Sequence, residues 1–197
     1  MRPSLAMAAV TLAACVMMPV LTRAAAPEWN VDTAASRVGF VAQRSGDPVP
    51  GEFTSFDATI RFSREDLDAS QVDVKILIGS VDAGAAERNQ TITSPSLFHA
   101  AKYPRARFKA DSFRKAKDGR YVAEGDLTMR GRTHPVDLPF ELDISRPDGK
   151  PRAVADGAVT VKRLRWGIGK GQWKDTSMVP NEVRIEIRIV ATRPAGE

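Results

Sequence analysis

The sequence predicts an all-β protein, an eight-stranded antiparallel β-barrel with a short helical insertion after the third strand. Eight stretches alternate apolar and polar residues at a period of two, as strands do when one face is buried and the other is wet. In the last stretch, 183–191, four branched apolar residues share one face and charged residues occupy the other. Between the third and fourth stretches, 83–103 lacks this alternation, which places the helical insertion there.

The first three strands are expected over 36–44, 52–63 and 71–79. The second is the clearest, because its apolar residues alternate with Asp57, Thr59 and Arg61 at a spacing that no helix matches. A turn-rich segment over 45–51 separates the first two strands. A single helical turn is expected over 63–67.

The insertion at 83–103 combines helix-forming alanines with a helix-start signal. Ser94 is an N-cap residue type, and Pro95 behind it is pre-set for the first helical turn. We therefore expect one or two short helices in this segment.

Five further strands are expected over 105–113, 121–130, 136–144, 153–166 and 183–191. Pro139 lies on the outer face of its strand, which predicts that the strand is locally unpaired or bulged there. Along 153–166, the parity that turns valines inward also turns Arg163 and Arg165 inward, so this strand ends in charge. A long loop, 167–181, leads to the last strand.

The N-terminal residues have the composition of an export signal. Arg2 precedes an apolar run over 5–21, and a cluster of alanines follows at 24–26. We therefore expect residues 1–26 to be a signal peptide that directs the protein to the periplasm. No linker divides the remainder, so 27–197 is expected to form a single domain.

Cys15 is the only cysteine of the chain. Removal of the signal peptide would leave a domain without disulfides, even in an oxidising compartment. A rival interpretation takes Leu12–Cys15 as a lipoprotein box, with Cys15 acylated and the protein tethered to a membrane. The apolar residues that continue to Leu21 argue against it.

The net charge and the residue types present argue against several classes of function. The formal net charge of +5 falls to +3 without Arg2 and Arg23, and basic residues alternate with apolar ones along strands, so no nucleic-acid partner is expected. His99 and His134 are the only histidines, with no metal-ligand spacing around them, so no metal or cofactor is expected. No Gly-x-Ser-x-Gly elbow or Ser/His/Asp set is evident, so no catalytic residue is assigned.

Six segments stand in a characteristic order and spacing. They are WNVDTAASRVGF at 29–40, GEFTSF at 51–56, the segment 79–88 that ends in Glu-Arg, LFHAAKYP at 97–104, GDLTMRGRTHPV at 125–136 and KRLRWGIG at 162–169. Together with the apolar final strand they resemble the YceI-like family of exported bacterial proteins. That resemblance implies a lipocalin-like barrel that binds polyisoprenoid or related long-chain lipids. The chain departs from the family pattern at Ala35, Asn89 and His99, where a family His or Asp is absent.

The residues alone leave open whether the barrel interior is a packed core or holds a ligand, since eight-stranded barrels do both. The resemblance favours a tunnel for a lipid chain. The expected ligand-binding residues are Phe40, Phe56, Ala58, Ile60, Val74, Ile76, Phe108, Leu127, Phe140, Arg163 and Trp166. Arg163 either meets oxygens of a ligand headgroup or extends to solvent at the rim, and Arg165 is expected at the rim.

The expected function is that of a periplasmic carrier without chemistry of its own. Its ligand would be a long-chain isoprenoid, either a polyprenyl or an isoprenoid quinone, or a related acyl lipid. One alternative is an enzyme that acts on such a lipid, and another is a packed barrel that acts through its surface on a membrane electron-transfer protein. A transient contact with the membrane or a membrane protein, and a homodimer, are left open.

Overall fold

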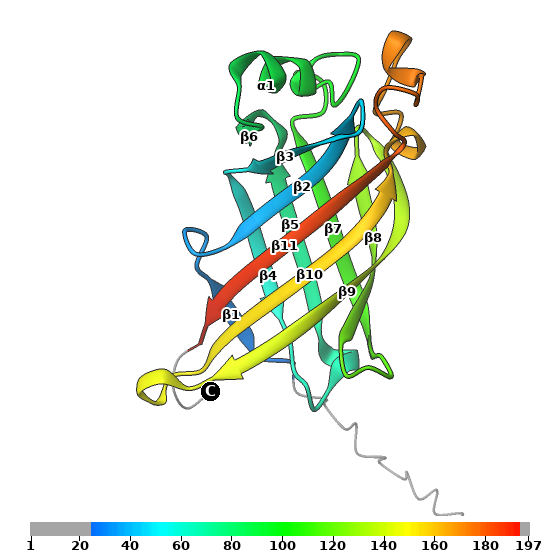
Figure 1. Ribbon diagram of the computed structural model, residues 1–197. Coiled ribbons are helices and arrows are strands. Elements are labelled where there is room, and N and C mark those ends of the chain that lie inside the picture. The colour runs from blue at the N-terminus through cyan, green and yellow to red at the C-terminus, as the bar shows by residue number, and fades with distance from the viewer. Residues whose placement is uncertain (1–24, 194–197) are drawn as a thin grey trace, which may run out of the picture.

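The computed structural model describes residues 25–193 (Figure 1). Apart from Ala25 and Ala26, the expected signal peptide over 1–26 lies outside these residues. The described strands are β1 (Glu28–Val31), β2 (Arg37–Arg44), β3 (Asp47–Phe53), β4 (Phe56–Arg61), β5 (Gln71–Leu77), β6 (Val81–Asp82), β7 (Arg105–Lys115), β8 (Tyr121–Met129), β9 (Arg132–Ser145), β10 (Arg152–Lys162) and β11 (Glu182–Thr192). The α-helix is α1 (Ala86–Thr93), and the 3₁₀ turns are η1 (Leu67–Ala69), η2 (Ile78–Ser80), η3 (Pro147–Gly149), η4 (Arg163–Trp166) and η5 (Gly171–Lys174).

The strands occupy eight positions around a closed antiparallel barrel. β1 and β2 follow one another along β11, and β3 and β4 follow one another along the next position. The ladder continues through β5, β7, β8, β9, β10 and β11, and pairing of β1 with β11 closes it. This confirms the eight-stranded antiparallel barrel, with α1 inserted after β5, the third predicted strand.

The segment expected to be a turn over 45–51 is instead mostly strand β3. The turn shrinks to Ser45 and Gly46, whose φ values of 53° and 90° fit a two-residue hairpin between β2 and β3. Pro48 and Pro50 are unusual within a strand, because proline cannot donate to a ladder. Both prolines lie beyond the short pairing of β3 with β6, so the side of the strand away from β2 needs no donor there.

Two helical predictions were misplaced. The turn expected over 63–67 is η1, which begins at Leu67 and is capped by the Asp66 carboxylate accepting from the amide of Ala69. Ser94 was expected to start a helix, but it is the C-cap of α1 and its amide donates to the carbonyl of Thr91. The Pro after it explains the error, since a residue before proline is disfavoured in the α region and helices end there.

The barrel is split between β9 and β10 on one side of Pro139. Pro139 pairs with Val122 of β8. The ladder between β9 and β10 begins at Ser145 and ends at the pair of Phe140 and Gly157, so it stops one residue before it would reach Pro139. The expected loss of pairing at Pro139 is therefore found on the β10 side alone. Trp166 of η4 is fully buried beside this split, and its indole N–H donates to the carbonyl of Leu127 at 2.9 Å.

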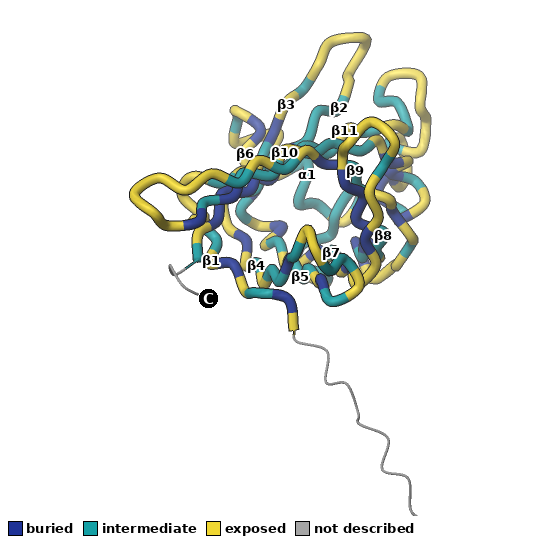
Figure 2. The backbone as a smooth tube through the Cα atoms, turned by 90° about the horizontal axis from the view of Figure 1, so that it is seen from below, coloured by how far each residue is buried: buried dark blue, intermediate teal, exposed yellow. Residues whose placement is uncertain are grey.

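One end of the barrel is filled by aromatic rings. Phe62 lies at the centre, with ring centroids 5.6, 5.5 and 6.0 Å from those of Phe113, Tyr121 and Phe140. The indole of Trp29 donates to the carbonyl of Phe62 at 3.0 Å. Figure 2, a view from below, shows buried and half-buried stretches in the barrel wall and exposed residues in most of its connections. We call this end, which carries the connections 62–70, 116–120 and 146–151, the closed end.

The opposite end carries the connections 45–46, 83–104, 130–131 and 163–181, and we call it the open end. Figure 1 shows α1 and the 163–181 connection standing on either side of the β2–β3 hairpin there. Among the described residues, no helix is long and apolar enough to span a membrane.

Candidate functional site

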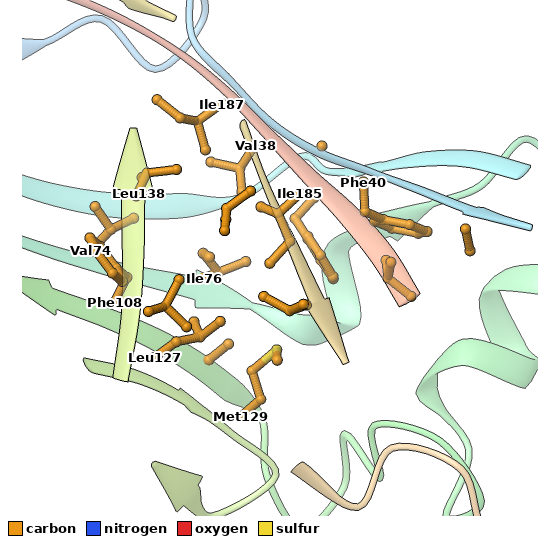
Figure 3. Close-up of a pocket in the computed structure, with 18 of the residues that line it drawn as sticks. Val38, Phe40, Val74, Ile76, Phe108, Leu127, Met129, Leu138, Ile185 and Ile187 are labelled. Carbon is orange, nitrogen blue, oxygen red and sulfur yellow. The ribbon is translucent and has the colours of Figure 1, made fainter. Parts of the chain in front are cut away.

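A cavity of about 790 Å³ runs inside the barrel. Figure 3 shows apolar side chains from many strands converging on it, among them Val38 of β2, Ile76 of β5 and Ile185 of β11. This volume falls within the roughly 300–1,000 Å³ typical of ligand pockets. Every strand position contributes inward residues, so the cavity is a product of barrel closure rather than of one motif.

The inward-facing residues behave as a cavity wall and not as a packed core. Ile60, Val74, Ile76, Ile185 and Ile187 all point into the barrel, yet each is only partly buried. In a close-packed interior such side chains would lose nearly all their exposure to neighbouring atoms. The sequence left undecided whether the interior is a packed core or holds a ligand. In the structure, part of the interior is not filled by side chains.

Most of the predicted ligand-binding residues lie on the cavity wall. These are Phe40, Ile60, Val74, Ile76, Phe108, Leu127, Phe140 and Arg163. Phe56, Ala58 and Trp166 are not part of the wall. Phe56 is buried in a cluster with Val38 and Ile189, and Ala58 packs against that cluster, although both share the parity of Ile60.

Arg163 does not have the position that strand parity predicted. β10 ends at Lys162, and η4 then turns the chain, so the alternation stops one residue before Arg163. Its side chain is 4 % exposed and donates to four backbone carbonyls of the 163–181 connection. They belong to Pro180 at 3.0 Å, Ile168 at 2.9 Å, Trp173 at 2.7 Å and Val179 at 2.7 Å.

This arrangement excludes solvent from Arg163 and holds the connection in place. Burial lowers the pKa of Arg163 from its ordinary value, because desolvation disfavours the charged form. Arginine is not deprotonated in proteins, so the guanidinium keeps its charge. The guanidinium is thus a loop-holding cation. Of the two alternatives for Arg163, extension to solvent at the rim is wrong, and contact with a ligand headgroup stays a prediction. Arg165 is exposed as expected, with its guanidinium carbon 5.6 Å from the centroid of Trp166.

The polar part of the wall lies at the open end, on residues that sequence patterning missed. The exposed wall residues are Gln43, Arg44, Asp47 and Pro48 from the β2–β3 hairpin, and Glu87 and Arg88 from α1. Because the exposed wall residues are confined to this end, the cavity reaches the surface there. Hairpin tips and a short polar helix carry no periodic signal, so nothing in the sequence marked these residues as neighbours.

The YceI-like domain model matches residues 29–191 of the chain. The chain belongs to the YceI-like family. It is 30% identical over 165 residues to a UPF0312 protein of Vibrio cholerae, a match that covers 81% of this chain and 86% of that protein. It is 37% identical over 106 residues to a UPF0312 protein of Photorhabdus laumondii, covering 53% of this chain and 55% of the relative, so that match spans about half of the relative's length.

Solved structures share the barrel of this YceI-like chain. BcnA of Burkholderia cenocepacia superposes with a TM-score of 0.76 at 30% identity, covering 83% of this chain and 100% of BcnA. A polyisoprenoid binding domain from Saccharophagus degradans superposes with a TM-score of 0.66 at 15% identity, covering 84% of this chain and 98% of that domain. At that identity the second likeness shows the shared fold alone.

The connections at the open end of this YceI-like barrel are tied to one another. The carbonyl of Ser96 accepts from the amides of Gly169 and Lys170 at 3.1 and 2.8 Å. Arg130, 7 % exposed, donates to the carbonyl of Pro95 at 2.9 Å and to that of Leu97. Arg130 has a φ of 50°, a left-handed conformation that arginine rarely adopts, so its guanidinium contacts compensate a backbone cost.

The two histidines contact aromatic rings, and one of them also contacts a backbone carbonyl. His134 has Nε2 3.0 Å from the carbonyl of Arg165 and its ring against Trp166, and the ring of His99 lies against Tyr103. Within residues 25–193, no group of three His, Cys, Asp or Glu side chains is placed to hold a metal ion. The prediction that the protein uses no metal or catalytic residue stays a prediction.

Proposed function

We propose that this protein is an exported binding protein that carries a long-chain isoprenoid or related lipid inside its barrel. The single observation that carries the proposal is the apolar cavity of about 790 Å³ that reaches the surface at one end. A polyprenyl or isoprenoid quinone would lie with its tail toward the closed end and its head at the open end. The neighbour from Saccharophagus degradans described as a polyisoprenoid binding domain supports this ligand class.

The distribution of polar groups supports a ligand with a long apolar tail. The charged residues of the wall are Arg44, Asp47, Glu87, Arg88 and Arg163, and all of them belong to the open end or to the β2–β3 hairpin that borders it. Deeper in the barrel, burial of each methylene contributes about 0.8 kcal/mol without any directional contact. A chain of many methylenes can therefore offset the cost of losing its freedom on binding.

The same distribution favours a carrier over an enzyme. General acid–base catalysis needs a titratable side chain within hydrogen-bond reach of the reacting group. The two wall carboxylates, Asp47 and Glu87, are both exposed at the surface, and the deep wall offers the ligand carbon atoms. We propose that the bound lipid is released unchanged, and time-dependent conversion of the bound lipid by the purified protein would contradict this.

Organic extracts of the protein, purified without detergent from its native compartment, should contain an isoprenoid or long-chain lipid in an amount close to that of the protein. Mass spectrometry of the extract gives the mass of the ligand and therefore its chain length and head. A barrel of similar size without such a cavity, purified in parallel, controls for lipid that adheres to any protein surface. An extract with no more lipid than this control would contradict the proposed function.

Export should leave a mature chain that begins near Ala25. Arg2, the apolar run over 5–21 and the alanine cluster at 24–26 form the proposed signal, and cleavage after Ala24 avoids placing Pro27 directly behind the cut. Intact-mass measurement of protein released from the periplasm checks this. A chain that begins at an acylated Cys15 would replace the freely diffusing carrier with a tethered one, and a chain that retains residues 1–26 would refute the export signal.

A further inference from the structure

The two ends of the barrel differ in charge. The open-end connections carry seven basic residues and two acidic ones, a net charge of +5, whereas the closed-end connections carry five of each. The seven are Arg88, Lys102, Arg130, Arg163, Arg165, Lys170 and Lys174, against Glu87 and Asp175. The basic excess of the connections is therefore gathered where the cavity opens.

Exposed apolar and aromatic groups stand among these cations. Met178, in the 163–181 connection, is 57 % exposed, which is the larger of the two values among exposed large hydrophobic residues of residues 25–193. Trp173 of η5 and Tyr103, at the end of the insertion, are half-buried at the same end. Aromatic side chains close to Lys and Arg are typical of protein surfaces that lie in a membrane interface.

The cations at the open end are held on anchored loops rather than on free ones. Four carbonyls of the 163–181 connection accept from Arg163, and the amide of Lys170 donates to Ser96 in the neighbouring insertion. The amide of Ser45 in the β2–β3 turn donates to the carbonyl of Met178 at 2.8 Å. These bonds hold the backbone from which Lys170, Lys174 and Met178 project, so the connection loses little additional backbone entropy when it meets a surface.

We propose that the open end docks on the surface of an anionic phospholipid bilayer, with Lys170, Lys174 and Met178 as its principal contacts. Phosphate groups of the lipid complement the net charge of this end, and Met178 enters the boundary between headgroups and acyl chains. Docking in this orientation brings the mouth of the cavity to the membrane. The inference rests on the proposed function, because a carrier of a membrane lipid must meet a bilayer to load or unload.

Vesicle co-sedimentation tests the proposal with the full mature protein. Phosphatidylcholine vesicles that contain phosphatidylglycerol should bind the protein, and this binding should weaken as salt is added, since surface charges are screened. Each cation near an anionic surface contributes about fivefold to partitioning, so Lys170→Gln with Lys174→Gln should lower it roughly twenty-fivefold. Met178→Ser should lower it about fivefold, because a partly buried apolar side chain is lost.

The matched control removes the same charge from the closed end. Lys117 and Lys150 are exposed in closed-end connections, at the other end of the barrel. Lys117→Gln with Lys150→Gln should leave vesicle binding within about twofold of the unaltered protein, because charges farther from the membrane than a Debye length of about 10 Å are screened. Equal loss in the two double variants would overturn the proposal. Binding that does not depend on phosphatidylglycerol, or that requires an added membrane protein, would overturn it as well.

Lipid binding in solution separates this proposal from the proposed function. Lys170, Lys174 and Met178 are not part of the cavity wall, so their variants should retain the extractable lipid of the unaltered protein. Their selective loss of vesicle binding supports docking by the open end. Charge-dependent vesicle binding by a protein that never yields lipid would support the docking surface while contradicting the carrier function.

Discussion

Val74→Trp should abolish lipid binding while leaving the barrel folded. Val74 lies on the cavity wall, pairs with Phe108 of β7 and is only partly buried, so an indole at this position can extend into the cavity. We expect the lipid recovered in organic extracts to fall at least 100-fold. The free energy of unfolding of the lipid-free protein should change by less than about 1 kcal/mol, because filling an empty apolar cavity forces no overlap with packed atoms.

Ala110→Trp is the matched control for Val74→Trp. Ala110 is 1 % exposed within the aromatic cluster and is not part of the cavity wall, so an indole there has no space to enter. Overpacking should destabilise this variant by about 3 kcal/mol or more, measured by denaturant unfolding. If Val74→Trp destabilised the protein as strongly as Ala110→Trp, the interior would be a packed core and the carrier hypothesis would fail.

Arg163→Met should destabilise the protein by about 3–5 kcal/mol, since it leaves four buried or partly buried carbonyl oxygens without their donor. The 163–181 connection should loosen first, because Arg163 is its principal anchor. Denaturant unfolding measures the stability, and hydrogen exchange of the amides of Ile168 and Trp173 measures the loosening. Both should respond in the lipid-free protein.

Arg165→Met provides the comparison two residues away. Arg165 is exposed over the ring of Trp166, where a cation–π contact contributes about 0.5–1 kcal/mol. Its loss should therefore change the stability by no more than about 1 kcal/mol. If Arg163→Met left stability and exchange unchanged but weakened binding of a headgroup-bearing lipid alone, Arg163 would act on the ligand, as the sequence first suggested, and its role as a loop anchor would be refuted.

Eight of the eleven described strands were predictable from the sequence, because each shows local alternation of apolar and polar residues. The short strands β1 and β6 were missed, and β3 was expected to be a turn. Ile60, Val74, Ile76 and Phe108 show how far that reasoning reaches, since parity alone placed them on the cavity wall. Phe56 has the same parity as Ile60 but packs into the cluster of Val38 and Ile189. Alternation along a strand predicts that a side chain points into the barrel. It does not predict whether that side chain packs against neighbouring side chains or borders the cavity.

The barrel and the place of the insertion could be read from the sequence, because burial of alternate residues is a local property of each strand. The family resemblance came separately, from motifs such as KRLRWGIG at 162–169. The position of the cavity and the role of Arg163 became visible in the three-dimensional structure. A cavity is the volume that all inward side chains together leave unfilled, so no single strand encodes it. The partners of Arg163 are backbone carbonyls up to 17 residues away, and every residue type carries the same carbonyl, so their convergence leaves no mark in the sequence.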